Sequence, residues 1–351
     1  MNMAIKTLEW KNNALKIIDQ TKLPLKLEYV YCKNLKTLWQ AIKTLKVRGA
    51  PALGVAAAFA VFLGIKDFKG KTKKQFIVEL DRVIKYIKLS RPTAVNLFWA
   101  LDRLRELARK NLHKPIGSIK KLLLKEAFKI LEEDRTICRK MADYGVNLIK
   151  KRDRILTICN AGALATVDYG TALGVIYRAK EVNKKIKVYS CETRPLLQGA
   201  RLTTWELKRA GIDVTLISDN MAADLMRKKM INKVLVGADR IASNGDTANK
   251  IGTYNLAILA KYHKIPFYVV GPISTFDLKI KNGRRIPIEQ RHSREVTQIQ
   301  GKQIAPLGIR VYNPAFDVTD NSLISAIITE KGIIRPPFTK NIKNTLKKEK
   351  C

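Results

Sequence analysis

Hydrophobic positions in the first half of the chain predict a small sheet followed by helices. Two short apolar segments, 7–10 and 14–18, flank the polar turn Asn12–Asn13, and residues 26–31 alternate with a period of two. This pattern is typical of an antiparallel unit. Helical spacing follows at residues 35–45, 51–63 and 76–88. An uninterrupted helical pattern from about 119 to 151 predicts a long helix that joins the two halves.

The second half has a different rhythm, in which short β-branched runs alternate with segments of helix length. The runs lie at residues 154–158, 186–190, 214–218, 233–236 and 267–270. Helices are expected between them, for example at 165–182 and 249–263. Strands that alternate with helices predict a parallel sheet covered on both faces, so the fold class is a doubly wound α/β domain behind a small N-terminal domain. We place these domains at 1–130 and 131–351, with a basic tail at about 339–351.

The large net positive charge does not by itself indicate a nucleic-acid-binding protein. The chain has 67 basic and 30 acidic residues among 351, a formal net charge of +37. The lysines are spread along the chain, without the aromatic and basic interleaving of an RNA-reading sheet. We therefore do not expect nucleic acid as a partner. A field of this sign favours phosphorylated small molecules.

Several other classes of protein are disfavoured by simple counts. Five widely spaced cysteines without a Cys-x-x-Cys pair indicate neither a disulfide framework nor a zinc site. The apolar stretch 49–65 is too short for a membrane span and contains Pro51, so we expect a buried helix and no membrane association. No apolar signal segment opens the chain, which favours the cytoplasm. There is no Gly-x-Gly-x-x-Gly for a dinucleotide.

Polar residues cluster directly after the predicted parallel strands. The clusters are Cys159-Asn160-Ala161-Gly162, Cys191-Glu192-Thr193-Arg194-Pro195, Asp219-Asn220 and Gly237-Ala238-Asp239-Arg240. In parallel α/β sheets, ligands bind at the carboxyl ends of the strands, near the point where the strand order reverses. Four such clusters at one edge predict an active site.

Cys159 and Asp239 are the candidate reactive groups. A thiol before a helix N-terminus tends toward the thiolate, because free amides and the helix dipole favour negative charge. A carboxyl that follows the apolar run 234–238 is expected in a dry crevice, where its pKa rises and it can serve as a general acid. The alternatives are a buried structural cysteine and a carboxylate that caps a helix or pairs with Arg240.

Three basic helix starts are candidate phosphate sites. Arg48-Gly49-Ala50-Pro51 places an arginine and small residues at the first turn of a helix, where free amides attract anions. Arg91-Pro92-Thr93 and Asn249-Lys250 have the same character. Each signal is weak alone, since proline and glycine begin many ordinary helices.

Together these motifs resemble the S-methyl-5-thioribose-1-phosphate isomerase family, from about Thr7 to Pro337. The matching segments are 48–51, 91–97, 159–166, 192–203, 218–223, 237–241 and 249–253. The resemblance implies a Rossmann-like C-terminal domain behind a small N-terminal domain, a homodimer, and no metal or cofactor. It implies an aldose–ketose isomerisation in methionine salvage, from 5-methylthioribose 1-phosphate to 5-methylthioribulose 1-phosphate.

The resemblance also assigns roles to individual residues. Cys159, as base or thiolate, and Asp239, as proton donor, are the catalytic pair. The substrate-binding residues it implies are Arg48, Gly49, Ala50, Arg91, Gln198, Asn249 and Lys250. Gln198 carries no signal apart from the family pattern. The chain departs from that pattern at Ile158, where histidine is common, and at Cys191, where an acidic residue is common.

Two related functions share the fold and some of the motifs. Ribose-1,5-bisphosphate isomerase resembles the chain in its cysteine and aspartate pair, but needs a second phosphate site in place of the methylthio group. Regulatory subunits of the guanine-exchange factor of eukaryotic translation initiation are a non-catalytic alternative. Such subunits generally lack the full pair, so the presence of Cys159 and Asp239 favours an enzyme.

Overall fold

The computed structural model describes residues 5–347, which form two compact units. The first unit runs to Arg139 and takes in Ala161–Gly174, and the second contains Lys140–Asn160 and the chain from Val175 onward. The division into domains at 1–130 and 131–351 stays a prediction, and the compact units differ from it by the segments 131–139 and 161–174. Of the predicted basic tail, residues 348–351 lie outside the described part.

A three-stranded antiparallel sheet opens the first unit, in the order β1-β2-β3. Its strands are β1 (Leu8–Lys11), β2 (Ala14–Ile18) and β3 (Tyr29–Cys32). Asn12 and Asn13 make the turn between β1 and β2 with φ of 53° and 55°. Two consecutive left-handed residues form the turn that suits the twist of a hairpin, and asparagine tolerates this conformation. The predicted hairpin is therefore present.

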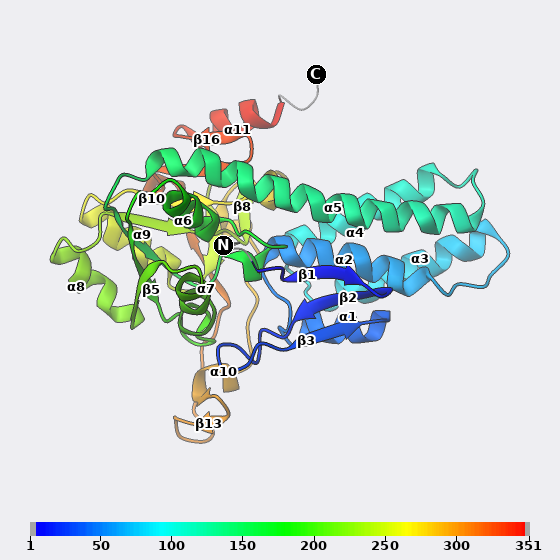
Figure 1. The fold of residues 1–351 in the computed structure, drawn as a ribbon, viewed down its shortest axis with the longest axis horizontal. Helices are drawn as coiled ribbons and strands as arrows, with labels where there is room; N and C mark the ends of the chain where they lie inside the picture. Colours follow the sequence, from blue (N-terminus) through cyan, green and yellow to red (C-terminus); the bar gives the residue numbers. More distant parts are fainter. Residues whose placement is uncertain (1–4, 348–351) are drawn as a thin grey trace. The chain divides into compact units, whose positions relative to one another are not determined.

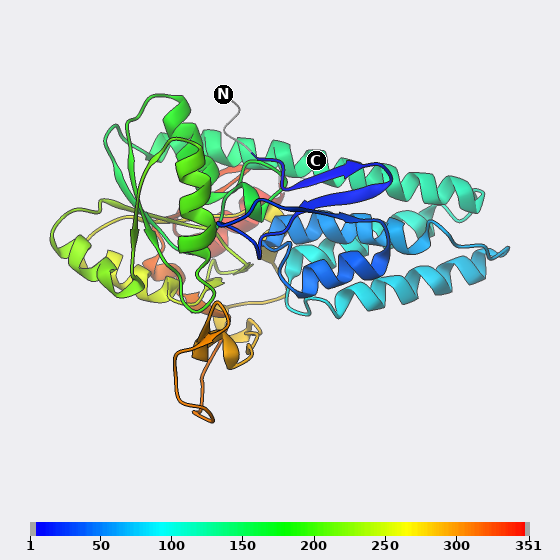
Figure 2. The ribbon, with the colours of Figure 1, turned by 60° about the horizontal axis from the view of Figure 1, so that its bottom comes forward.

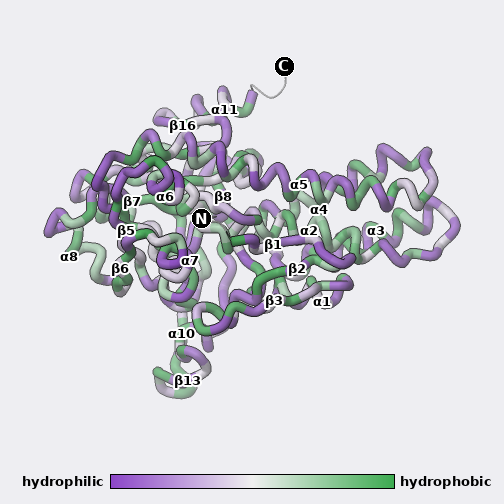
Figure 3. The backbone as a smooth tube through the Cα atoms, in the orientation of Figure 1, coloured by the Kyte–Doolittle hydropathy of each residue, from purple (hydrophilic) through white to green (hydrophobic). Residues whose placement is uncertain are grey.

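Helix α2 is the centre of the first unit. The helices are α1 (Leu35–Lys43), α2 (Ala50–Ile65), α3 (Lys73–Lys88), α4 (Val95–Lys110) and α5 (Ile116–Gly145). α2 is apolar on all sides and packs against α1, α3 and α4. The hydrophobic core around it also contains the inner face of the three-stranded sheet (Figure 2). Purple hydrophilic residues recur along α3 and α5 (Figure 3), as expected of helices with one solvated face.

The segment Ala161–Gly174 corrects the helix predicted at 165–182, because α6 covers only Ala172–Glu181. Its earlier part is tied to distant residues of the first unit. Thr7 Oγ1 donates to the carbonyl of Ala163 at 2.7 Å, and Asp134 accepts a hydrogen bond from the Val167 N–H at 2.8 Å. Gly170 has a φ of 95°. These contacts over a long sequence distance override the local helical pattern.

Asp134 makes the stability of the first unit depend on pH. Burial raises the pKa of this carboxyl to about 7, against the opposing effect of the Val167 N–H. The folded pKa lies above the unfolded value of about 4. The protonated side chain therefore contributes stability at low pH, and this contribution is lost as the pH rises through 7.

We predict that Asp134→Asn raises the free energy of unfolding at pH 8 by on the order of 1–3 kcal/mol, and by less at pH 5. Denaturant unfolding of both proteins across this pH range measures the difference. A difference that does not change with pH would contradict the assignment.

The second unit contains a seven-stranded sheet in the order β16-β15-β10-β7-β4-β5-β6 (Figure 1). Its strands are β4 (Arg154–Thr157), β5 (Lys187–Cys191), β6 (Asp213–Ile217), β7 (Lys233–Val236), β10 (Phe267–Val270), β15 (Ala326–Thr329) and β16 (Gly332–Ile334). All neighbouring pairs are parallel except β15 with β16. The six parallel strands follow the doubly wound order, with β4 as the first strand at the centre.

Helices and a second, smaller sheet complete this unit. The helices are α6, α7 (Thr204–Arg209), α8 (Ala222–Arg227), α9 (Thr253–Tyr262), α10 (Arg294–Thr297) and α11 (Phe338–Lys347). The smaller sheet has the order β11-β8-β9-β14, with strands β8 (Arg240–Ala242), β9 (Thr247–Lys250), β11 (Phe276–Asp277) and β14 (Phe316–Thr319). β12 (Gln298–Ile299) and β13 (Lys302–Gln303) form a separate hairpin.

The predicted fold class is confirmed: a parallel-dominated α/β sheet and a small antiparallel N-terminal sheet with helices. A second expected helix differs, in addition to the one predicted at 165–182. The segment 249–263 begins as strand β9, and α9 starts only at Thr253. Asn249 pairs with Asp317 of β14, 68 positions later in the chain, so a non-local ladder replaces the predicted first turn.

Candidate active site

Two neighbouring strands of the large sheet deliver the candidate pair to one edge. β4 and β7 are parallel, with Leu156 opposite Val234, and the strand order reverses between them. Cys159 follows the end of β4, and Asp239 follows the end of β7. The crevice outside the carboxyl ends at such a reversal is where doubly wound sheets bind ligands. The second unit therefore brings both residues to its expected binding edge.

Cys159 is held in an unusual backbone conformation by two threonines. Its φ is 62°, its N–H donates to Thr193 Oγ1 at 2.8 Å, and its carbonyl accepts from Thr203 Oγ1 at 2.6 Å. Left-handed backbone at a residue other than glycine is uncommon and is concentrated at functional sites. Only a short 3-10 turn, Ala163–Ala165, follows at once, so the helix-dipole argument for a thiolate is wrong.

A buried glutamate supports the residues beside Cys159. The Glu206 carboxylate accepts hydrogen bonds from Asn160 Nδ2 at 2.8 Å and from the Tyr177 hydroxyl at 2.7 Å. Asn160 Nδ2 also donates to Thr203 Oγ1 at 3.2 Å. Glu206 is 3% exposed. This network fixes the chain on both sides of the thiol, and sequence analysis missed it because its members are far apart in the chain.

The loop after β5 is anchored by Asp219. Its carboxylate accepts from the N–H groups of Thr193 at 2.8 Å and Arg194 at 2.7 Å. A Cβ on Gly199 would lie 1.7 Å from the carbonyl oxygen of Cys191, so only glycine fits there. Gln198 precedes Gly199 and is 6% exposed, and its side-chain oxygen has no partner among the described residues. A buried, unpaired acceptor at this edge is consistent with a ligand contact.

Asn249 and Lys250 are the last two residues of β9 in the smaller sheet, and Asp239 directly precedes its strand β8. Asp239 is half-buried and donates its N–H to the Ala248 carbonyl at 2.9 Å, so its surroundings are less dry than the sequence predicts. Asn249 is buried, with Nδ2 donating to Thr253 Oγ1 at 3.1 Å. Lys250 Nζ donates to the carbonyl of Ala315 at 3.0 Å. Asn249 and Lys250 therefore lie on a strand, and not on a helix start as expected.

The first unit contains the other predicted binding residues. Gly49 is the N-cap of α2 with a φ of 94°, and Ala50 begins the helix. Arg48 is 9% exposed and donates from Nε to Gln20 Oε1 at 3.0 Å. The predicted helix start at 48–51 is therefore present.

Arg91 precedes α4, the helix beside α2. A Cβ on Gly54 would lie 3.1 Å from the carbonyl oxygen of Asn96. Gly54 is in the early turns of α2 and Asn96 is the second residue of α4. The N-terminal ends of these helices are therefore adjacent, and both basic helix starts lie at one end of the first unit.

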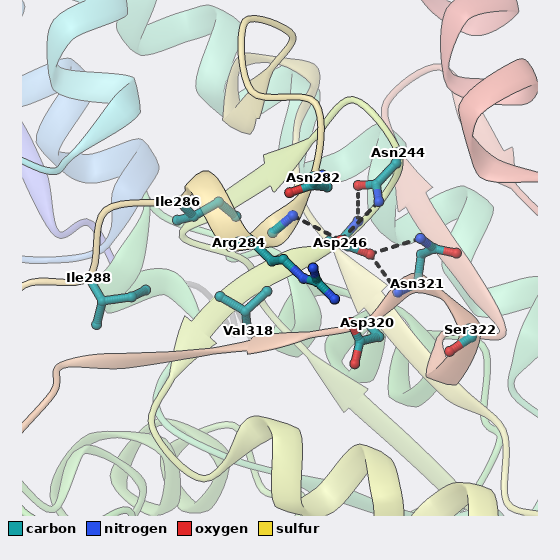
Figure 4. Close-up of a pocket in the computed structure, with 11 residues that line it drawn as sticks. Asn244, Asp246, Asn282, Arg284, Ile286, Ile288, Val318, Asp320, Asn321 and Ser322 are labelled. Atoms are coloured by element: carbon teal, nitrogen blue, oxygen red, sulfur yellow. Dashed lines mark hydrogen bonds between the residues drawn. The ribbon is translucent and has the colours of Figure 1, made fainter.

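A cavity of about 620 Å³ lies beside the β8–β9 turn and the end of β14 (Figure 4). None of the predicted site residues lines it. Its wall is organised by Asp246, which is 7% exposed. The Asp246 carboxylate accepts from Asn244 Nδ2, the Gly283 N–H, and both the N–H and Nδ2 of Asn321. It thereby joins the β8–β9 turn to the end of β14.

Asp246 is predicted to stabilise this sheet most at neutral pH. Burial alone would raise the pKa of this carboxyl, but the donors on Asn244, Gly283 and Asn321 together hold it below its usual value. Its contribution is therefore present above the unfolded pKa of about 4 and is lost as the pH falls below that value.

Asp246→Ala should lower the free energy of unfolding at pH 7 by roughly 2–4 kcal/mol, because buried donors lose a charged acceptor. Asp320→Ala, an exposed carboxylate of the same cavity, is the matched control, and denaturant unfolding is the measurement. Equal effects of the two substitutions would show that the network does not hold the sheet.

The described residues offer no obvious metal centre. Within 5–347, no group of three histidine, cysteine, aspartate or glutamate side chains is placed to hold a metal ion.

The chain is similar over nearly its whole length to proteins named methylthioribose-1-phosphate isomerase. It is 54% identical over 347 residues to methylthioribose-1-phosphate isomerase of Thermotoga neapolitana, with 99% of each chain covered. It is 52% identical over 344 residues to the protein of the same name from Bacillus cereus, covering 98% of this chain and 97% of the other.

Two solved structures are similar over almost the whole chain. One is 5-methylthioribose 1-phosphate isomerase from Pyrococcus horikoshii, 44% identical with a TM-score of 0.89, covering 97% of this chain and 96% of the other. The second is described as translation initiation factor eIF-2B, subunit delta, from A. fulgidus. It is 47% identical with a TM-score of 0.85, covering 98% of this chain and 99% of the other. The profile of the initiation factor 2 subunit family matches residues 46–336. The chain therefore belongs to the initiation factor 2 subunit family.

Proposed function

We propose that the protein is an aldose–ketose isomerase that converts 5-methylthioribose 1-phosphate to 5-methylthioribulose 1-phosphate, a reaction of methionine salvage. The observation that carries this proposal is identity of 52–54% over nearly the full chain to relatives named for this activity. The presence of Cys159 and Asp239 at the strand-order reversal supports it.

The chemistry explains why an acid and a second group are required. The phosphate on the anomeric carbon keeps the sugar ring closed, so a proton donor has to assist ring opening. C1 and C2 then exchange oxidation level. Asp239 is the proposed donor, and Cys159 as a thiolate is the proposed base that removes the proton from C2. A hydride shift from C2 to C1 is the alternative, in which the thiol only supports the reacting carbons.

The family resemblance assigns substrate binding, largely through the phosphate, to Arg48, Gly49, Ala50, Arg91, Gln198, Asn249 and Lys250. Arg48, Gly49, Ala50 and Arg91 supply two guanidinium groups and the N-terminal turn of α2, which suit a phosphate dianion. Support comes from the unpaired Gln198 oxygen and the excess of positive charge over the chain.

Homodimerisation and a cytoplasmic location are further proposals from the family resemblance. No helix within the described residues has the length and apolar character needed to cross a bilayer.

A regulatory, non-catalytic role is the second candidate, favoured by the description of the A. fulgidus structure. It predicts no turnover of the sugar phosphate. Ribose-1,5-bisphosphate isomerase is a third, and it predicts that the bisphosphate is the better substrate.

Replacement of either member of the pair should remove turnover without removing the fold. We expect Cys159→Ser and Asp239→Asn each to lower kcat about 10²–10⁴-fold, because each loses a proton-transfer group. Formation of the ketose is followed by carbon and phosphorus NMR, and binding of the sugar phosphate by calorimetry.

Matched controls are Cys32→Ser, a buried thiol in the first unit, and Asp224→Asn, an exposed carboxylate on α8. Both should keep near wild-type kcat. If the two site variants do so as well, the assigned pair is incorrect.

A further inference from the structure

Strand β14 and the residue before it hold the end of β9, where two proposed substrate ligands lie, and the turn that follows. The Ala315 carbonyl accepts from the Ile251 N–H at 3.1 Å and from Lys250 Nζ at 3.0 Å. Two residues later, in β14, Asp317 Oδ2 accepts from the Gly252 N–H at 2.7 Å. Lys250, Ile251 and Gly252 are thus all bonded to the segment Ala315–Asp317.

The turn is also closed internally. Asn249 Nδ2 donates to Thr253 Oγ1 at 3.1 Å, and Thr253 Oγ1 donates to the Lys250 carbonyl at 2.6 Å. Asn249 stands directly opposite Asp317 in the antiparallel ladder. Gly252 has a φ of 99°, which only glycine adopts readily. The geometry of the turn therefore depends on what holds Gly252.

Asp317 occupies the N-terminus of α9, where an external anion would otherwise bind. Gly252 is the N-cap of this ten-residue helix, and its N–H points to the carboxylate. A negative charge at this position is stabilised by the free amides and the helix dipole. The amides are thus satisfied from within. Asn249 and Lys250, whose side chains donate to Thr253 Oγ1 and to the Ala315 carbonyl, are held in place beside this helix end.

The second carboxylate oxygen shows that this arrangement is not optimised for stability. Asp317 Oδ1 is buried and has no hydrogen-bond partner among the described residues. A buried polar atom without a partner costs free energy. A carboxylate that is kept at this cost indicates a role beyond stability.

We propose that Asp317 is a positioning residue for the isomerisation: its carboxylate holds Gly252 and thereby fixes Asn249 and Lys250 against the sugar phosphate. The assignment rests on the proposed function. It concerns substrate binding and not the proton transfers, so it predicts a change in KM with little change in kcat.

The surroundings of Asp317 predict when its charge is present. Burial raises the pKa of this carboxyl to about 6, while the N–H groups of Gly252 and Tyr254 and the charge of Lys250 act in the opposite direction. The short 3-10 helix Gly283–Arg285, which packs against β14, also carries Arg284 and Arg285. Asp317 is therefore ionised at pH 8 and largely protonated at pH 5.

The test compares Asp317→Ala and Asp317→Asn with wild-type protein in the isomerase assay. Asp317→Ala should raise KM about 10-fold or more at pH 8 and change kcat less than about threefold. Asparagine keeps an oxygen acceptor for the Gly252 N–H, so the KM of Asp317→Asn should stay close to that of wild type. Asp320→Asn, the exposed carboxylate just beyond β14, is the control and should match wild type.

The dependence of KM on pH supplies a second readout, which a purely structural role of Asp317 would leave unchanged. The substrate phosphate also titrates near pH 6, so wild type and Asp317→Asn share that part of the profile. Wild type should show a small additional rise in KM between pH 8 and pH 5, which Asp317→Asn lacks. This rise should stop at the KM of Asp317→Asn, because protonated aspartic acid and asparagine offer the Gly252 N–H a similar neutral acceptor. If Asp317→Ala fails to fold, this comparison alone decides the proposal.

The outcomes separate this proposal from the function on which it rests. Absence of turnover by wild-type protein would overturn the proposed function. Turnover by wild type together with an unchanged KM in folded Asp317→Ala, or with identical pH profiles for wild type and Asp317→Asn, would overturn the positioning role alone.

Discussion

The reversal of strand order beside β4 is the constraint on which the site depends. Because β5 and β6 extend the sheet to one side and β7 and β10 to the other, the chain leaving β4 cannot be covered by a neighbouring crossover. Cys159 lies on that exit, and Asp239 lies on the exit from β7. Doubly wound sheets bind their ligands at such a reversal, outside the carboxyl ends of the two strands. Without it, these residues, 80 positions apart, would have no reason to share an edge.

Buried or half-buried carboxylates then fix the loops that leave this edge and the smaller sheet beside them. Asp219 holds the segment after β5, Glu206 the segment after β4, and Asp246 and Asp317 the two ends of the β9–β14 ladder. Each accepts hydrogen bonds from the backbone or from neutral side chains, which are stronger when the acceptor is charged. In a chain with 67 basic residues, the 30 acidic ones are thus used in part as internal anchors, while the cations remain for the phosphate.

Local sequence patterns predicted what local physics determines. The Asn12–Asn13 hairpin, the apolar α2 and the parallel strands all follow from turn chemistry or hydrophobic spacing over a few residues. The errors arose where distant residues decide the structure. The chain before α6 is bonded to Asp134, and β9 pairs with β14, so the helices expected at 165 and 249 begin later.

The residues of the candidate site also fall into those that have a local sequence signal and those that depend on distant partners. Cys159, Asp239 and the basic helix starts are visible as polar residues after strands or before helices. Glu206 and Asp317 were missed, because their partners come from remote segments. Asp317 did leave a trace, a single acid within the apolar strand Phe316–Thr319, and a charge inside a buried strand pattern is a signal that merits attention.

The central claim, that this edge performs a sugar-phosphate isomerisation, is tested most directly by one measurement. Purified protein is incubated with 5-methylthioribose 1-phosphate labelled with carbon-13 at C2, in parallel with ribose 1,5-bisphosphate, and the C2 resonance is followed. The account predicts a ketone signal from the methylthio sugar, formed faster than from the bisphosphate. Two unchanged substrates, with the protein folded, would contradict it.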